Sequence, residues 1–371
     1  MISILATQTK LGAYDLPNRV VMAPLTRMRA DSNYAPGDLA AEYYGQRATA
    51  GLIIAEATQI SQQGQGYPNT PGIYTDTQIE GWKKITDTVH KKGGKIFLQL
   101  WHVGRLSFSA YQPDNALPVA PSAIAAPGHA YLPDFTRADY QVPRALTKDE
   151  IKIIVNDYRN AAVNAKKAGF DGVEVHASNA YLIEQFLKSV SNHRTDEYGG
   201  SIENRARFLF DVLDAVLSVW GNDKTGIRLS PFNISGIPAE PDPYPQYDYV
   251  IKRLAQYKLA YLHIIEAKEI NPGQGLALAN VPLDTEKLYV KHIREFYKEP
   301  IIVAGGFDKE RAEIVLEKSY VDAVAFGRYY VSTPDLAYRL INGIAPNELD
   351  SSTYYGGGRK GYTDYPFYSA E

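Results

Sequence analysis

Cysteine is absent from the chain of 371 residues. This absence excludes disulfide bridges, thiolate zinc sites, cysteine-ligated iron–sulfur clusters and a cysteine nucleophile. It restricts the chemistry of the protein more than it indicates a cellular compartment.

A marked excess of charge of either sign is also absent. The 39 basic and 42 acidic residues leave a formal net charge of −3, which provides no general field for nucleic acid or anionic membrane. No apolar run approaches the roughly 20 residues that cross a bilayer, and the beginning of the chain lacks the features of a signal peptide. We therefore expect a soluble, cytoplasmic protein that binds neither nucleic acid nor membrane.

The remaining composition is that of a chain with a large core. Hydrophobic residues make up 45% and charged residues 22% of the chain, which excludes disorder. Tyrosine stands out, with 28 residues against 12 phenylalanines. Large rings that carry a polar tip are suited to line a pocket.

Short apolar, β-branched runs recur along the chain, each followed by a stretch of helical character. They cover residues 20–27, 52–58, 95–102, 172–178, 225–231, 261–267, 300–306 and 323–329. Near-continuous apolar strands are typical of a parallel sheet that is covered on both faces. Eight strand–helix units in a row predict an α/β protein, a closed (β/α)₈ TIM barrel.

The stretches between the runs have helical periodicity. The clearest begins with the capping-box pattern of Thr147 and Glu150, and others are expected at 78–92, 202–220, 282–297 and 309–319. An open, doubly wound sheet is the alternative architecture. Against it, no Gly-x-Gly-x-x-Gly turn follows the first run, and the number of units is eight.

The chain is longer than the roughly 250 residues that a barrel requires. Much of the surplus lies between His102 and Thr147, where six prolines make a core helix improbable. Residues 234–247 form a second proline-rich stretch. Both follow the carboxyl ends of strands, where barrels carry out their chemistry. We predict a single domain over residues 1–371, with lid excursions at about 103–146 and 234–247.

Polar residues at the ends of the runs are candidates for function because a barrel directs them toward one mouth. They are Thr26, Gln99, Trp101, His176 and Arg228, with Gly305-Gly306 and Gly327-Arg328 on the last two units. Each also has a purely structural explanation. A threonine can cap a helix, and a lone histidine at a strand end is more often structural than catalytic.

The last two units indicate a phosphorylated ligand. Barrels commonly bind phosphate in the loops after strands seven and eight. Gly305-Gly306 and Gly327 allow close approach of backbone N–H groups, and Arg328 can clamp a phosphate with two hydrogen bonds. Tight packing with a surface arginine is the alternative explanation.

His176, Asn179 and Tyr181 lie within six residues where the fourth run ends. No acidic partner or second histidine stands at metal-binding spacing, so we expect no metal site. The first two side chains can hold a carbonyl or phenolate oxygen with two donors. A tyrosine near its ordinary pKa of about 10 stays protonated at neutral pH, as a general acid must.

These residues belong to a longer stretch that resembles the old yellow enzymes, a family of flavin-dependent ene-reductases. The most specific part is HASNAYLIEQFLKSVSNHRTDEYGGSIENRARF, residues 176–208. Supporting stretches are NRVVMAPLTRMRA at 18–30, FLQLWHVGR at 97–105, VAFGR at 324–328 and YYGGGRKGYTDYP at 354–366. The resemblance extends from about Ile2 to Tyr368.

The resemblance implies a noncovalently bound FMN at the mouth of the barrel. Its ring would contact Pro24, Leu25, Thr26, Ala57 and Gln99, with Arg228 beside the pyrimidine edge. Its phosphate would be held by Gly305, Gly306, Gly327 and Arg328. Tyr67, Trp101 and Tyr355 would form walls of the substrate pocket.

The resemblance also implies a reaction. NADPH, or NADH, would supply a hydride through FMN to activated alkenes such as α,β-unsaturated carbonyls, nitroalkenes and maleimides. His176 and Asn179 would bind the substrate oxygen, and Tyr181 would protonate the product. Phenolic ligands would occupy the same pocket, in a monomer or homodimer. The family uses His-His or His-Asn as the oxygen-binding pair, and Asn179 places this chain in the second group.

Two other functions stay open on the residues alone. One is a metal-independent barrel isomerase or aldolase acting on a sugar phosphate, for which Glu56 or Glu266 could serve as the base. The other is a flavin-binding or storage protein. The absorption spectrum of the purified protein would distinguish a flavoprotein from the isomerase or aldolase.

Overall fold

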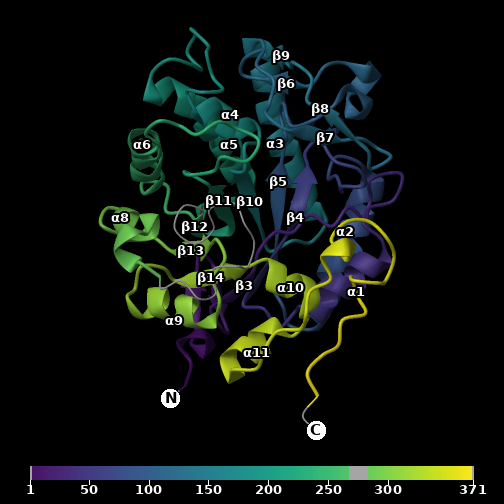
Figure 1. Cartoon of the computed structure of the whole chain (residues 1–371), viewed down its shortest axis with the longest axis vertical. Coiled ribbons are helices and arrows are strands. Elements are labelled where there is room, and N and C mark those ends of the chain that lie inside the picture. Colours follow the sequence, from purple (N-terminus) through teal and green to yellow (C-terminus); the bar gives the residue numbers. More distant parts are fainter. Residues whose placement is uncertain (1, 267–282, 370–371) are drawn as a thin grey trace.

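Eight parallel strands close into a barrel at the centre of the molecule (Figure 1). The computed structural model describes residues 2–266 and 283–369. In their order around the barrel, the strands are β3 (Val20–Met22), β4 (Leu52–Gln59), β5 (Ile96–Trp101), β10 (Gly172–Ala177), β11 (Thr225–Leu229), β12 (Tyr261–Ile265), β13 (Ile301–Ala304) and β14 (Ala323–Phe326). Each lies within or overlaps one predicted run. The pairing of β14 with β3 closes the sheet, which confirms the barrel and excludes the open alternative.

Helices surround the barrel. They are α1 (Asp38–Gln46), α2 (Asp76–Lys91), α3 (Lys148–Lys167), α4 (Leu182–Leu187), α5 (Ile202–Trp220), α6 (Tyr244–Leu254), α8 (Tyr289–Arg294), α9 (Lys309–Glu317), α10 (Arg328–Ser332) and α11 (Leu336–Asn342). The predicted capping box of Thr147 and Glu150 begins α3. The helix expected at 282–297 is shorter than predicted, since α8 covers Tyr289–Arg294. Pro282, the first residue of the predicted helix, lies outside the described residues.

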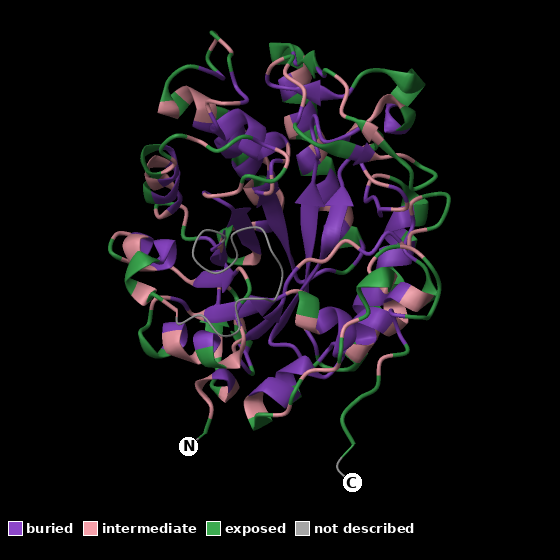
Figure 2. Ribbon diagram, in the orientation of Figure 1, coloured by how far each residue is buried: buried purple, intermediate pink, exposed green. Residues whose placement is uncertain are grey.

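Two hydrophobic cores follow from the alternation of side chains along the strands. Leu98 and Leu100 of β5 belong to the larger core, between the strands and the helices. Phe97 of the same strand belongs to the smaller core, inside the barrel. Figure 2 shows the strands buried and the outer loops exposed. Leu11 and Leu16 join the inner core from a hairpin of β1 (Thr9–Leu11) and β2 (Tyr14–Leu16).

The first predicted lid excursion contains short strands that lie together in Figure 1. They are β6 (Val119–Ala120), β7 (His129–Tyr131), β8 (Arg137–Asp139) and β9 (Arg144–Ala145). Of these, β7 and β8 form an antiparallel hairpin, and β6 pairs with β9. In the second predicted excursion, α6 already begins at Tyr244. Within the described residues, no helix is long and apolar enough to cross a membrane.

The C-terminal segment is fastened to the loop after β3. The buried Arg27 guanidinium donates from Nε to the Tyr354 carbonyl at 2.9 Å and from Nη2 to the Gly361 carbonyl at 2.7 Å. In return, the Gly356 N–H donates to the Arg27 carbonyl at 3.0 Å. These contacts hold the backbone on either side of Tyr355 against the segment that follows β3.

Candidate active site

The carboxyl ends of the barrel strands bring the sequence-predicted residues to one mouth. Because β14 pairs with β3, the turn at Gly327 lies against the segment that follows β3. A Cβ on Gly327 would lie 3.4 Å from Cδ2 of Leu25. Pro24 and Thr26 flank Leu25, and all three are partly exposed. Ala57 lies nearby on the adjacent strand β4 and is buried.

The turn after β13 requires glycine. Gly305 has a φ of +132° and Gly306 a φ of +87°, values that side chains disfavour. A Cβ on Gly305 would lie 2.4 Å from the Glu266 carbonyl oxygen. Arg328, exposed, begins α10, and its N-cap residue Gly327 makes no side-chain cap hydrogen bond. The adjacent strands β13 and β14 are therefore each followed by glycine, and Arg328 lies beside them. Accessible backbone N–H groups and an arginine are what a phosphate site needs.

A buried polar face lines the inside of the barrel along β5, β10, β11 and β12. Gln99 donates from Nε2 to Oε1 of Glu174 at 2.7 Å. The other oxygen of Glu174 lies 2.9 Å from Nδ1 of His263. Sequence reasoning missed Glu174 and His263. The available signal was alternation, because Glu174 stands two residues before His176 on the same strand.

Arg228 completes this face. Its side chain is 8% exposed, and among the described residues its Nε has no hydrogen-bond partner. Burial lowers the pKa of Arg228, and the nearby Glu174 partly offsets this shift because its negative charge favours the charged guanidinium. A buried guanidinium donor without a partner is costly, so this position calls for an acceptor on a ligand.

His176 faces the mouth next to Arg228, its register partner on β11. Its Nδ1 lies 3.0 Å from the Ser178 hydroxyl. Burial, with Arg228 and His263 close by, holds the pKa of His176 well below its ordinary value. The imidazole is therefore neutral near pH 7. If Ser178 donates to Nδ1, the Nε2 nitrogen carries the hydrogen and is the available donor.

The turn after His176 holds two successive residues in the left-handed region. Asn179 has a φ of +57° and Ala180 a φ of +64°, a conformation that costs about 1–3 kcal/mol per residue. The Asn179 N–H donates to the Ser230 hydroxyl at 2.8 Å, and Ser230 donates to Oε1 of Glu184 at 2.9 Å. The Ala180 N–H donates directly to the Glu184 carboxylate.

Glu184 thus holds both N–H groups of the strained turn. It is fully buried and pairs with the buried Lys188 ammonium, 3.4 Å away. Lys188 in turn donates to the Asn233 carbonyl at 2.7 Å, immediately before the second lid excursion. Sequence reasoning missed this pair because an acid and a lysine four residues apart are usually an exposed helix pair.

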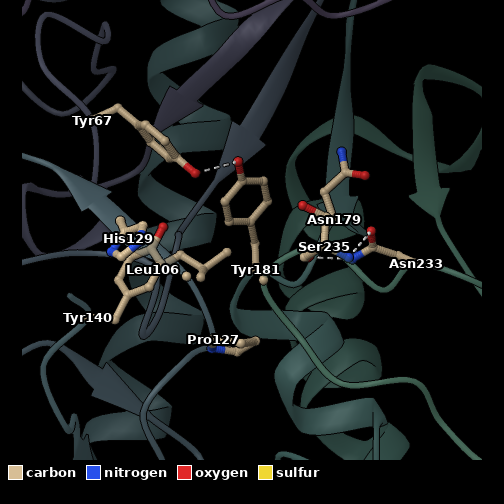
Figure 3. Close-up of a pocket in the computed structure, with 11 residues that line it drawn as sticks. Tyr67, Leu106, Pro127, His129, Tyr140, Asn179, Tyr181, Asn233 and Ser235 are labelled. Atoms are coloured by element: carbon tan, nitrogen blue, oxygen red, sulfur yellow. Dashed lines mark hydrogen bonds between the residues drawn. The ribbon is translucent and has the colours of Figure 1, made fainter. Parts of the chain in front are cut away.

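A cavity of about 370 Å³ opens between the turn and the lids. Its lining residues are Tyr67, Leu106, Pro127, Gly128, His129, Tyr140, Asn179, Tyr181, Asn233, Ser235 and Gly236. Figure 3 shows the Tyr181 hydroxyl directed at the Tyr67 hydroxyl, to which it donates at 3.3 Å. The Asn179 side chain lies beside the Tyr181 ring in the same view.

Aromatic rings surround Tyr181. Trp101 and His176 both meet its ring edge-on, each with a centroid distance of 4.9 Å. Tyr67 stacks on Trp101 at 5.6 Å. Burial raises the pKa of Tyr181, so the phenol is protonated at neutral pH. Tyr355, 49% exposed, lies within electrostatic range of both Tyr67 and Tyr181 but outside the cavity lining.

Glu56 and Glu266, the candidate bases of an isomerase or aldolase, both accept hydrogen bonds from other parts of the protein. Glu56 accepts hydrogen bonds from the Arg27 N–H and the Tyr44 hydroxyl, both at 3.2 Å, and burial raises its pKa to about 7. Glu266 accepts the Val290 N–H at 2.6 Å. In the described part of the chain, no cluster of three or more potential ligands could hold a metal ion.

The barrel is closed, glycine turns follow its last two strands, and the interior Arg228 has an Nε with no hydrogen-bond partner among the residues that the structure describes. This is the architecture of a cofactor-binding barrel enzyme. The model of the NADH:flavin oxidoreductase / NADH oxidase family matches residues 7–347, and the chain belongs to this family. It is therefore an FMN-dependent oxidoreductase.

Several known proteins resemble the whole chain. The 12-oxophytodienoate reductase 1 of Oryza sativa subsp. japonica is 44% identical over 368 residues, covering 98% of this chain and 93% of the relative. A probable flavin mononucleotide-dependent alkene reductase of Leishmania infantum is 41% identical over 370 residues, with 99% and 98% covered. The structure of morphinone reductase in complex with tetrahydroNAD is 48% identical, with 98% of both chains covered and a TM-score of 0.90. These findings confirm the predicted resemblance to the old yellow enzymes.

Proposed function

We propose that this oxidoreductase uses NADPH, or NADH, to reduce α,β-unsaturated carbonyls, nitroalkenes and maleimides at their activated double bond. One observation carries the proposal. The neutral imidazole of His176 and the amide of Asn179 flank the protonated phenol of Tyr181 beside an aromatic cavity. The names of the relatives agree with it, since one is a probable alkene reductase.

The residues at the mouth fit FMN. Arg228 Nε, which has no partner in residues 2–266 and 283–369, suits an acceptor on the pyrimidine edge, and the glycine turns leave room for a phosphate. We assign the phosphate to Gly305, Gly306, Gly327 and Arg328. We assign the ring to Pro24, Leu25, Thr26, Ala57, Gln99 and Arg228. When bound, FMN would take up a hydride from the nicotinamide and deliver it to the alkene.

His176 and Asn179 act on the substrate oxygen. Each donates one hydrogen bond to the carbonyl, nitro or imide oxygen, where negative charge develops as the double bond is reduced. The left-handed turn fixes the amide before substrate binds, because Glu184 and Ser230 hold its backbone. Removing one such preorganised donor typically raises the barrier by about 2.7–4 kcal/mol.

Tyr181 supplies the proton. Its raised pKa keeps the hydroxyl protonated, and its place on the cavity wall brings the proton to the α-carbon of a bound alkene. Tyr67 and Trp101 pack around the phenol. We assign Tyr355, which lies beyond the residues that line the cavity, to the outer rim of the pocket. Phenolic ligands would be held by the same two donors.

The absorption spectrum and a turnover panel test this function. The purified protein, alone or after addition of FMN, is expected to show a flavin spectrum and to oxidise NADPH when cyclohexenone, a nitroalkene or a maleimide is added. A protein that stays colourless with FMN would refute the proposal. A flavoprotein that turns over none of these compounds with either nicotinamide would instead indicate flavin storage.

A further inference from the structure

Glu174 has no role in the function proposed above, yet it lies at the centre of the barrel. It is 0% exposed and stands on β10, directly opposite Gln99 of β5 in the strand register. Burying a carboxylate is expensive unless its charge is paired and its oxygens are hydrogen-bonded. Its position therefore needs an explanation.

Both oxygens of Glu174 are engaged by residues of the inner polar face. Oε1 accepts from Gln99 at 2.7 Å, and Oε2 lies 2.9 Å from His263. Gln99 uses one of its two amide N–H groups in this contact, so its carbonyl oxygen and its second N–H are left for another partner. The contact thereby fixes which end of the Gln99 amide points away from the acid.

Glu174 also faces a positive charge. It opposes the effect of burial on the Arg228 guanidinium, which lies on the neighbouring strand β11. Burial lowers the pKa of His263 and favours its neutral form, so the imidazole does not neutralise the acid. The carboxylate and the guanidinium are thus the two formal charges of this face, buried together under the mouth.

We propose that Glu174 is a positioning residue that lowers the reduction potential of the flavin by orienting Gln99 and offsetting the charge of Arg228. The inference rests on the proposed placement of the pyrimidine edge beside Gln99 and Arg228. Two-electron reduction adds negative charge to a flavin, which Arg228 favours and a carboxylate behind it opposes. The reduction potential of the flavin therefore depends on both charges, and without Glu174 the charge of Arg228 would raise it.

The test is the midpoint potential of the holoprotein, measured by spectroelectrochemistry with bound FMN. Glu174→Gln keeps the shape and the acceptor for Gln99 but removes the charge. We expect the reduced-to-oxidised ratio at a fixed potential to rise at least tenfold, an upward shift of about 30 mV for a two-electron couple. Ile302→Val, a change in the apolar part of the same interior, is the control and should leave the potential unchanged.

A matched pair covers the case in which Glu174→Gln does not fold. Glu174→Asp and Glu174→Asn have the same size and differ in charge, so the potential of the Asn variant should lie above that of the Asp variant. Equal potentials in the charged and neutral variants would overturn the inference while leaving the proposed function intact. A wild-type protein that binds no FMN would overturn both.

Discussion

Replacing Tyr181 by phenylalanine should separate proton transfer from every other role of this side chain. Phenylalanine keeps the ring that meets Trp101 and His176 edge-on at 4.9 Å. Within the described part of the chain, the one side-chain hydrogen bond that it loses is the bond to the Tyr67 hydroxyl. At 3.3 Å that bond is long, so its loss should cost no more than the lower end of the usual 0.5–1.5 kcal/mol, about 0.5 kcal/mol.

The catalytic loss should be far larger. Removal of a positioned general acid typically slows the step that it serves by about 10²–10⁴-fold. Stopped-flow absorbance would follow the two half-reactions separately, flavin reduction by NADPH and reoxidation by cyclohexenone. We expect the first rate to stay within about twofold and the second to fall by the full factor. An equal loss in both half-reactions would refute the assignment of the proton to Tyr181.

Tyr67→Phe is the matched control, since it removes the other hydroxyl of the same hydrogen bond. Its reoxidation rate should stay near that of the wild type. The pH dependence adds a second check. Because burial raises the pKa of Tyr181, its protonated form persists to higher pH than an ordinary phenol with a pKa of about 10. Reoxidation should therefore not decline from neutral to mildly alkaline pH through loss of this proton.

Three further substitutions test other parts of the site. His176→Ala should weaken phenol binding about 10–100-fold, the equivalent of a charge-assisted hydrogen bond, seen as loss of the long-wavelength charge-transfer band; an unchanged band would contradict its role. Arg328→Ala should weaken FMN binding by a similar factor and riboflavin binding much less, and equal weakening in fluorescence titrations would remove its phosphate role. Lys188→Met leaves the Glu184 charge buried without its cation and should destabilise the protein by about 3–5 kcal/mol in urea unfolding. The double variant Glu184→Gln with Lys188→Met should recover part of that loss; a double variant no more stable than the single would argue against the ion pair.

The barrel could be predicted because its strands carry a strong pattern. Runs such as Leu52–Gln59 and Gly172–Ala177 are buried along their whole length, and a sheet covered on both faces produces that continuous apolar signal. The small strands of the first lid could not be predicted, since β6 and β9 have two residues each. Elements of that length are held by neighbouring loops rather than by their own periodicity.

The sequence predicts that His176, Asn179 and Tyr181 lie together at a strand end, but it does not predict the backbone conformation that orients them. Asn179 is in the left-handed region although it is not a glycine, the residue that usually indicates this conformation. The strain is tolerated because Glu184 and Ser230 accept the N–H groups of the turn. Ser230 is 51 residues from Asn179, so a local pattern carries no information about that contact, whereas Glu184 is only four residues from Ala180.

The two acids that the sequence analysis missed suggest how such residues can be recognised. Glu174 interrupts an apolar strand two residues before His176, and Glu184 lies on a helix whose six residues are all buried. A buried carboxylate costs several kcal/mol unless neighbouring donors satisfy it, so each must hold a set of donors in a fixed place. Glu174 holds the Gln99 amide and lies within electrostatic range of the Arg228 guanidinium, while Glu184 holds the turn that carries the proposed oxygen-binding amide. In the proposed function, these two acids therefore orient the residues that bind the cofactor and the substrate oxygen without touching the substrate themselves.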